Sequence, residues 1–397
     1  MERLVQKKRT RNYGVDILKM LSMFMVVTLH TLGNGGVLES TEKNSLNFAV
    51  AYFIETAALC AVNVFAMTSG YLIVNSKCSY LKIIPLWLSV FFYSSIISIL
   101  FKFVPYIKRD ISIKDFIKCS FLPTLNKDYW YFTSYFGLYF FIPYINKALH
   151  AISKQEHKKL VITIIVLYAV LPLVHLYRVD VFEVKRGYSP IWLGALYVVG
   201  AYFKLYPVKV SKLVSFLMYI VSVIIAWSSI FTEHIDFLNY DSFFIITSGI
   251  SLLLFFTQVN ITSKRLQKLI VLGSSVSFSV YLIQDHPSCR HFLKNKLKNF
   301  AKDPFYLLIL KVLATAGAIY LSASIIDLFR HYLFKYLKVN NIPKLLKEKF
   351  SESRVKETDS FQKLNNNSDT ENGKDSVNPM DKIDERNNES LIVKVQL

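Results

Sequence analysis

Cysteine and charge are both scarce in this 397-residue sequence. The four cysteines, Cys60, Cys78, Cys119 and Cys289, are scattered, so their spacing predicts neither a metal site nor a disulfide framework. Charged residues make up only 19% of the chain and cluster between long apolar runs. These runs lack the period-two alternation that a transmembrane β-barrel requires. The first run is too long for a cleavable signal peptide and lacks a small-residue cleavage site, so we expect no such peptide.

Long hydrophobic runs dominate what is present. The chain is 53% hydrophobic and its mean hydropathy is +0.34. Continuous apolar runs predict an all-α, polytopic helical membrane protein with about ten transmembrane helices. The expected spans are residues 14–33, 47–73, 80–104, 129–146, 160–177, 188–206, 212–231, 241–258, 267–285 and 305–334. We expect a membrane domain over residues 1–338 and a polar tail over 339–397, whose segment 351–397 is too poor in apolar residues to fold.

The formal net charge of +19 would suggest nucleic acid as a partner if the protein were soluble. In a membrane protein, basic residues in surface loops fix the orientation and meet anionic lipid, so we expect a bilayer and no nucleic acid. The basic N-terminus, MERLVQKKRTR, is predicted to stay in the cytoplasm. An even number of spans then places the C-terminus in the cytoplasm as well.

The first apolar run carries Lys19 near its start and His30 near its end. Eleven residues of helix rise about 16 Å and make about three turns, so both side chains lie on one face. Such a face should meet protein, water or substrate rather than lipid. His30 is either a hydrogen-bond donor to a neighbouring helix or a general base for a hydroxyl nucleophile. Lys19 either extends to the interface or binds an anionic cosubstrate from the cytoplasm.

Two carboxylates accompany this face. Asp16 precedes Lys19 by one turn and can orient it or cap the helix start. Glu55 lies inside the second run, where an isolated carboxylate must be protonated, paired or exposed to water. It is either a helix-packing hydrogen-bond partner or the acid that holds the His30 ring. Ser69 and Gly70, later in that run, predict close packing between helices.

Aromatic and charged residues gather at the expected outer ends of two further runs. They are Trp130 and Tyr131 at the fourth run and Tyr281, Asp285, His286 and Arg290 at the ninth. The aromatic residues form an interfacial belt or stack on a sugar ring, and the charged residues begin a solvated loop or face the same site as His30. Arg186, Tyr188 and Trp192, at the start of the sixth run, leave the same alternatives open.

Four segments resemble the acyltransferase-3 family of integral-membrane acyltransferases, especially its surface-polysaccharide O-acetyltransferases. Asp16, Leu18 and Lys19, followed after ten further residues by His30, match the family's opening motif, with lysine in place of arginine. Lysine keeps the positive charge but lacks the planar guanidinium with which arginine makes two hydrogen bonds to a phosphate. The segments VNVFAMTSGYLI (62–73), YWYFTSYFGLYFFIPYI (129–145) and SFSVYLIQDHPSCR (277–290) resemble later motifs. In the last of these, Gln284 replaces the family's usual histidine.

The resemblance, which extends over residues 11–335, implies acyl transfer from cytoplasmic acetyl-CoA to a hydroxyl of an extracytoplasmic glycan at a bacterial plasma membrane. Acetyl-CoA is then a cosubstrate, and no permanently bound cofactor is expected. Lys19, with Arg11 and Asp16, is expected to bind a CoA phosphate. His30, held by Glu55 or another acid, is expected to take the proton of the sugar hydroxyl. A covalent acyl-enzyme ranks lower because the sequence offers no distinctive nucleophile.

Three other classes compete with this interpretation. A transporter or flippase of lipid-linked sugars would also place polar residues in the membrane, although no internal repeat supports it. A glycan polymerase would be expected to carry acidic or arginine-rich outer loops, whereas these loops are richer in lysine. A structural or sensory membrane protein is disfavoured by the family resemblance. Consumption of acetyl-CoA separates the acyltransferase from all three.

Overall fold

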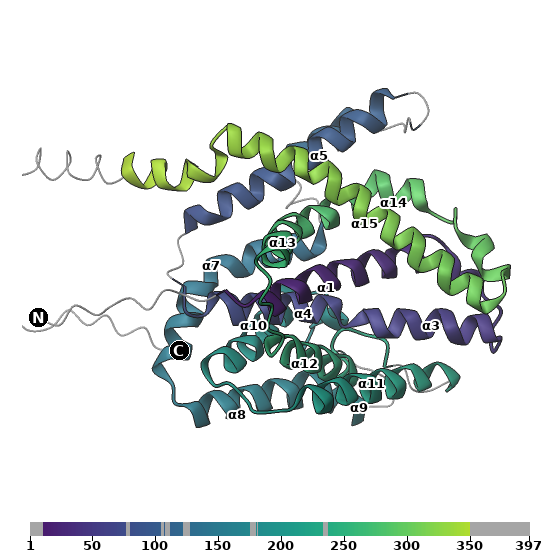
Figure 1. Ribbon diagram of the computed structural model, residues 1–397, viewed down its shortest axis with the longest axis horizontal. Coiled ribbons are helices and arrows are strands. Elements are labelled where there is room, and N and C mark those ends of the chain that lie inside the picture. Colours follow the sequence, from purple (N-terminus) through teal and green to yellow (C-terminus); the bar gives the residue numbers. More distant parts are fainter. Residues whose placement is uncertain are drawn as a thin grey trace, which may run out of the picture. The chain divides into compact units, whose positions relative to one another are not determined.

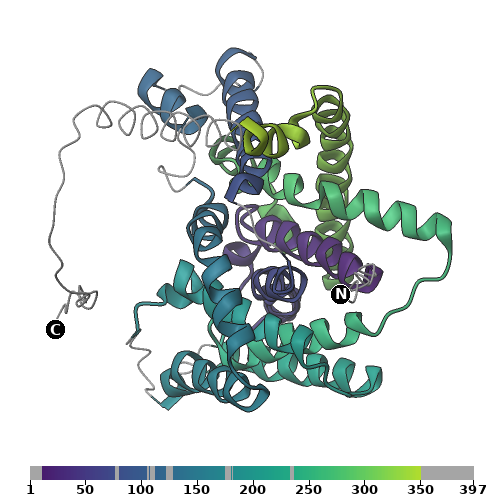
Figure 2. The same ribbon diagram turned by 90° about the vertical axis from the view of Figure 1, so that its left-hand side faces the viewer.

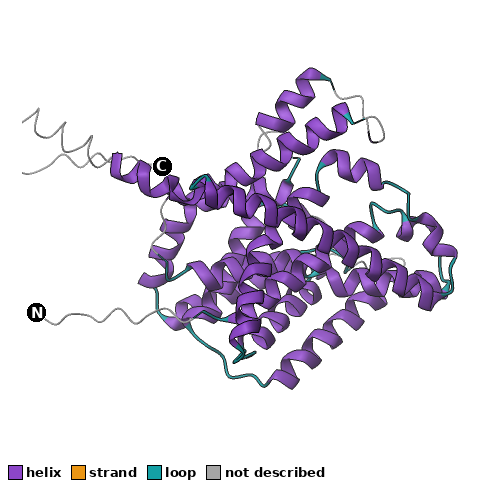
Figure 3. Ribbon diagram, turned by 45° about the horizontal axis from the view of Figure 1, so that its top comes forward, coloured by secondary structure: helices purple, strands orange, loops and turns teal. Residues whose placement is uncertain are grey.

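The computed structural model describes residues 11–76, 80–104, 107, 112–121, 128–174, 180, 182–232 and 237–349. Contacts group Met1–Pro343 into one compact unit and Lys344–Leu397 into a second. In the second unit, Lys344 Nζ lies 3.7 Å from Glu348 Oε1. The described residues contain helices and no strand (Figure 3). The basic stretch 1–10 and the tail 351–397 lie outside the described residues.

The helices of the first unit follow the apolar runs of the sequence (Figure 1). The α-helices are α1 (Tyr13–Leu32), α2 (Val37–Ser40), α3 (Leu46–Leu59), α4 (Ala61–Ile73), α5 (Ile83–Phe103), α6 (Ile113–Phe121), α7 (Trp130–Ala151), α8 (Lys154–Ile165), α9 (Leu171–Val174), α10 (Pro190–Leu205), α11 (Lys212–Ser228), α12 (Phe243–Thr257), α13 (Lys264–Gln284), α14 (Pro287–Leu293) and α15 (Phe305–Tyr336). The π-helical turn η3 (Val166–Val170) joins α8 to α9, and the 3₁₀ turns are η1 (Tyr80–Lys82), η4 (Lys185–Gly187), η5 (Ser229–Phe231), η6 (Lys298–Lys302) and η7 (Val339–Asn341).

Six helical segments of the described chain are long and apolar enough to cross a membrane, which confirms a helical membrane protein. The prediction of about ten crossings is not settled by this finding, although each of the ten runs contains helix. The expected second span is two helices, because the backbone of Cys60 separates α3 from α4. The expected outer loops are also partly helical, since they contain α6 and α14.

Helix α1 lies at the centre of the first unit. It contacts α3, α4, α12, α13 and α15, and the two perpendicular views show neighbours on opposite sides of it (Figures 1 and 2). The Asn12 side chain caps its start by accepting a hydrogen bond from the Val15 amide at 3.2 Å. The residues of α1 therefore face protein along much of their length, as the polar face of this helix requires.

Helices α4 and α10 approach each other closely through small residues. A Cβ atom on Gly70 would lie 2.0 Å from the Tyr197 carbonyl oxygen, and one on Gly200 would lie 1.9 Å from the Met67 carbonyl oxygen. Only glycine fits at either position, so the two backbones are in direct contact. The expected packing role of Gly70 is confirmed, and this contact holds α10 and the loop before it in place.

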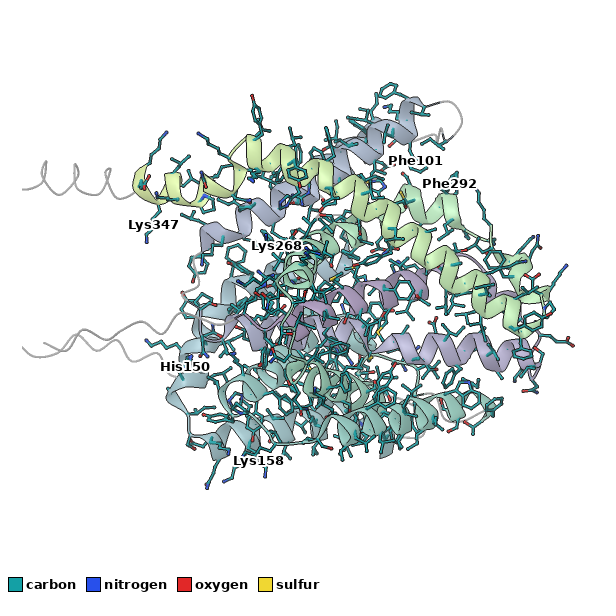
Figure 4. The ribbon with its side chains drawn as sticks, viewed as in Figure 1. Phe101, His150, Lys158, Lys268, Phe292 and Lys347 are labelled. Atoms are coloured by element: carbon teal, nitrogen blue, oxygen red, sulfur yellow. The ribbon has the colours of Figure 1, made fainter. Side chains whose placement is uncertain are left out.

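Labelled side chains locate the two ends of the first unit (Figure 4). His150, at the end of α7, lies toward the end where α1 begins. Phe101 and Phe292 lie toward the opposite end, where α1 finishes, and their ring centroids are 6.1 Å apart. We refer to these as the Lys19 end and the His30 end.

A buried charged cluster joins α5 to α15. Arg330 donates to both carboxylate oxygens of Asp327, from Nε at 2.5 Å and from Nη2 at 3.0 Å. The Tyr93 hydroxyl donates to Asp327 Oδ1 at 2.6 Å. The side chains of Arg330 and Asp327 are 10% and 0% exposed. This pair was missed by the sequence analysis, and its only signal was two opposite charges three residues apart inside an apolar run.

We expect Arg330→Ala to destabilise the protein by about 3–5 kcal/mol, because it leaves the buried Asp327 carboxylate without its cation. The measurement is thermal unfolding of the purified protein in detergent. Replacing both partners, as Asp327→Leu with Arg330→Met, should restore much of the loss. Lys335→Ala removes an exposed cation of the same helix and is the matched control. Equal midpoints for Arg330→Ala and this control would show that the pair does not stabilise the fold.

Candidate active site

His30 lies in the last turn of α1 and meets the end of α13. Its Nδ1 lies 2.6 Å from Gln284 Oε1 and 3.7 Å from Asp285 Oδ1. With Gln284 Oε1 as the acceptor, a neutral His30 ring carries its proton on Nδ1 and keeps the lone pair on Nε2. The ring is therefore oriented and has the tautomer that a general base needs.

Asp285 connects His30 to a second cation. Arg290 Nε lies 3.6 Å from Asp285 Oδ1, and Arg290 Nη2 donates to the Asp128 carbonyl oxygen at 3.2 Å. The Asp285 side chain is 3% exposed. The carboxylate is thus placed to stabilise a positive charge on His30 after proton transfer.

A pocket next to His30 is walled mainly by aromatic side chains. It is lined by Met23, Val26, Leu29, His30, Val62, Phe65, Trp130, Tyr131, Tyr240, Phe278 and Tyr281. Three of the residues predicted to contact the acceptor, Trp130, Tyr131 and Tyr281, lie in this wall. His30 is the one side chain of this lining that can act as a base near neutral pH. An apolar wall around one imidazole suits a reaction that must exclude water.

The Lys19 end holds a network of polar side chains. Arg11 Nε lies 2.5 Å from Asp16 Oδ2, and the Ser274 hydroxyl donates to Asp16 Oδ1 at 3.0 Å. Lys19 Nζ donates to the same hydroxyl at 3.1 Å. The structure thus brings the three residues predicted to bind a phosphate together, with Asp16 between the two cations.

An open groove of about 650 Å³ lies beside this network. Its lining residues come from the start of α1, from one face of α13 and from α15, and they are Tyr13, Lys264, Gln267, Lys268, Val271, Leu272, Ser275 and His331. Tyr13 of α1 and Ser275, which follows Ser274, place the groove at the Lys19 end, while Arg11, Asp16, Lys19 and Ser274 themselves are outside its lining. Lysine side chains and a histidine with no carboxylate in this lining make the groove suited to an anion.

Comparison of the sequence with protein families shows which family the chain belongs to. A model of the acyltransferase-3 family, described as an acyltransferase domain, matches residues 12–323 and so covers most of the 397-residue chain. The chain belongs to the acyltransferase-3 family. It is therefore a membrane acyltransferase. No curated protein and no solved structure matches it.

Four residues of this acyltransferase that were predicted for catalysis or acceptor binding do not line the pocket beside His30, namely Glu55, Asp285, His286 and Arg290. Glu55 makes no hydrogen bond to His30 in the structure, and its Oε2 is buried without a hydrogen-bond partner among the described residues. In the structure, Gln284 and Asp285 lie beside the His30 ring, so Asp285 is the other acid that the sequence left open, and a role for Glu55 stays a prediction. Both carboxylates lie in or beside apolar helices, so the sequence could not show which of them reaches α1.

For His286, the sequence left open the start of a solvated loop or a place facing the same site as His30. The His286 side chain is buried, and its Nδ1 accepts from the Ser288 amide at 3.1 Å, which caps the start of α14. Its Nε2 lies 3.3 Å from the Ser98 hydroxyl of α5. His286 does not line the pocket beside His30 and instead joins α14 to α5.

Tyr240 is one of the pocket residues that the sequence analysis did not single out. It precedes α12 in a segment without lysine or arginine and is 8% exposed. The Asn63 side chain fixes this segment by donating to the Tyr240 carbonyl oxygen at 2.6 Å, and Trp192 Nε1 donates to Asn63 Oδ1 at 3.1 Å. A tyrosine just before an apolar run carries no sequence signal for a site, because the same position fits an interfacial belt.

Proposed function

We propose that this acyltransferase transfers an acetyl or similar short acyl group from cytoplasmic acetyl-CoA to a hydroxyl of a cell-surface or lipid-linked glycan. The observation that carries the proposal is the placement of two different sites on one helix. A cation-lined groove lies at the Lys19 end of α1, and an oriented base in an aromatic pocket lies at the other end. Such an arrangement suits a donor with a phosphate-rich body and an acceptor with hydroxyl groups.

In the proposed reaction, His30 Nε2 takes the proton from the acceptor hydroxyl while the hydroxyl oxygen attacks the thioester carbonyl. The C–O bond forms, the C–S bond breaks, and the CoA sulfur takes the proton from the His30 imidazolium and leaves as a thiol. Asp285 stabilises the imidazolium, and Gln284 keeps Nδ1 as the donor. Direct transfer is favoured over an acyl-enzyme, because the described pocket lining contains no serine, threonine or cysteine.

The same proposal assigns the groove along α13 to the acyl donor. The phosphates of CoA would bind along α13, where Lys264 and Lys268 lie one helical turn apart. Lys19 would sit deeper, toward the thioester arm, with Arg11 at the mouth. In this proposal, the groove and the N-terminus face the cytoplasm, and the His30 pocket faces the outer side of the cell membrane. The charge of the N-terminal segment supports this orientation.

We expect Lys264→Ala and Lys268→Ala each to raise the KM for acetyl-CoA by about threefold, with a smaller change in kcat, because each removes one exposed cation from the groove. Steady-state release of free CoA measures both constants. Lys158→Ala, an exposed lysine of α8, is the control variant. The effect should weaken as ionic strength rises. A KM for acetyl-CoA that stays unchanged in the double variant would place the donor elsewhere.

A further inference from the structure

A second cavity opens at the His30 end, outside the pocket just described. Its polar side chains are Asp180, Arg186, Asn239, Asp241 and Ser242, and α9 and the adjoining π-helical turn supply the apolar part of its wall. The set combines two carboxylates, an amide, a guanidinium and a hydroxyl. None of these residues takes part in the proposed transfer reaction.

Ser242 indicates that this cavity accommodates a polar ligand. The residue is 6% exposed, and its hydroxyl has no hydrogen-bond partner among the described residues. It occupies the N-cap position of α12 without making the usual side-chain cap. A buried hydroxyl without a partner costs free energy, so its position in the wall of a polar cavity points to a partner supplied from outside.

The wall of the cavity is held in an uncommon backbone conformation. Glu183, Lys185 and Arg186 all have positive φ angles between 50° and 55°. Asp180 stabilises this turn by accepting from the Val184 amide at 2.9 Å and from the Lys185 amide at 2.5 Å. Strained backbone that is fixed by such contacts is typical of binding sites, because it sets the direction of a side chain before the ligand arrives.

The same turn packs directly against the residues before α12. A Cβ atom on Gly187, whose φ is +91°, would lie 2.4 Å from the Tyr240 Cβ atom and 3.1 Å from Trp192 Nε1. Arg186 and Tyr188 therefore lie on either side of a residue in direct contact with Tyr240. Asn239 and Asp241 flank Tyr240 on the other segment, so the cavity and Tyr240 belong to one structure.

Three aromatic rings connect this cavity to the pocket beside His30. The ring centroids of Trp130 and Tyr188 are 4.6 Å apart, those of Tyr188 and Tyr240 are 4.9 Å apart, and those of Trp130 and Tyr240 are 6.1 Å apart. Trp130 and Tyr240 also line the pocket beside His30. Tyr188 is 50% exposed, so one ring of the group is open to a ligand.

We propose that the cavity at Asp180, Arg186, Asn239, Asp241 and Ser242 is a second saccharide subsite, and that the acceptor is an oligosaccharide or polysaccharide spanning both sites. This inference rests on the proposed function. Sugar hydroxyls donate to carboxylates and accept from guanidinium and amide groups, while the aromatic rings cover the C–H face of a sugar ring. The two carboxylates disfavour an anion, and the guanidinium disfavours a metal ion.

The test measures acceptor-stimulated CoA release against acceptor length. The probe is the host cell's surface polysaccharide, treated with alkali to remove acyl groups, partly hydrolysed and fractionated from one to about six sugars. The full-length protein should use fractions of two or more sugars with a KM at least about threefold below that for single sugars. Arg186→Ala, Asp241→Ala and Tyr188→Ala should reduce this preference. Lys43→Ala and Glu42→Ala remove exposed charges at the same end and are the matched controls.

The outcomes separate the two proposals. Transfer that depends on His30 but shows no dependence on acceptor length would overturn the second subsite and leave the proposed function intact. A length preference that all three variants retain would also overturn it. If no fraction stimulates CoA release, the glycan acceptor itself is wrong. Thermal unfolding of each variant, together with Tyr188→Phe as a conservative replacement that should keep the preference, separates loss of the subsite from loss of the fold.

Discussion

His30→Ala should lower acceptor-stimulated CoA release by about 10²- to 10⁴-fold, which is the range for losing a general base. His30 is the one base in the described pocket lining, and its Nδ1 is already occupied by Gln284. The loss should fall on kcat, because proton removal contributes in the transition state and little to binding of either substrate.

The matched variant is His30→Gln, which keeps a polar side chain that can reach Gln284 but cannot take a proton at neutral pH. It should be about as inactive as His30→Ala. Acetyl-CoA should bind both variants as it binds the unmodified protein, since the donor groove lies at the other end of α1. Full transfer activity in both variants would show that His30 is only a helix-packing residue.

Asp285→Asn should lower kcat by about 10²-fold, because it removes the negative charge that stabilises the imidazolium while preserving the size of the side chain. Asp285 is nearly fully buried between His30 and Arg290, so solvent cannot replace that charge. Acceptor-stimulated CoA release at saturating acetyl-CoA measures the change.

Glu55→Gln is the comparison that distinguishes the two carboxylates. Glu55 makes no hydrogen bond to His30, so this variant should lose much less activity than Asp285→Asn. The opposite ranking, with Glu55→Gln the more damaging, would mean that Glu55 rather than Asp285 acts on the base during the reaction.

The long apolar helices could be predicted from the sequence because each lies in a continuous apolar run with polar ends, whereas the short helices α6 and α14 lie in expected loops. The break at Cys60 could not, since the apolar run 47–73 continues through it without proline or glycine at the break. The number of crossings is likewise not set by composition, because helices such as α10 and α12 are apolar but short.

Part of the candidate site followed from local sequence pattern and part did not. Lys19 and His30 share a face because of helical geometry alone, so their importance could be predicted. The partner of His30 depends on how α13 packs against α1, more than 250 residues later in the chain, and no local pattern encodes that contact. The same holds for Tyr240 and Ser242, whose roles depend on a turn held together by Asp180 and Gly187.

The most direct test of the account is transfer across a sealed membrane. Purified protein would be reconstituted into vesicles with deacylated surface glycan trapped inside and acetyl-CoA labelled in its acetyl group supplied outside. The account predicts labelled glycan inside the vesicles, and none with His30→Ala, because the donor groove and the acceptor pocket lie at opposite ends of α1. Label that enters the glycan only when both substrates are on the same side would contradict it.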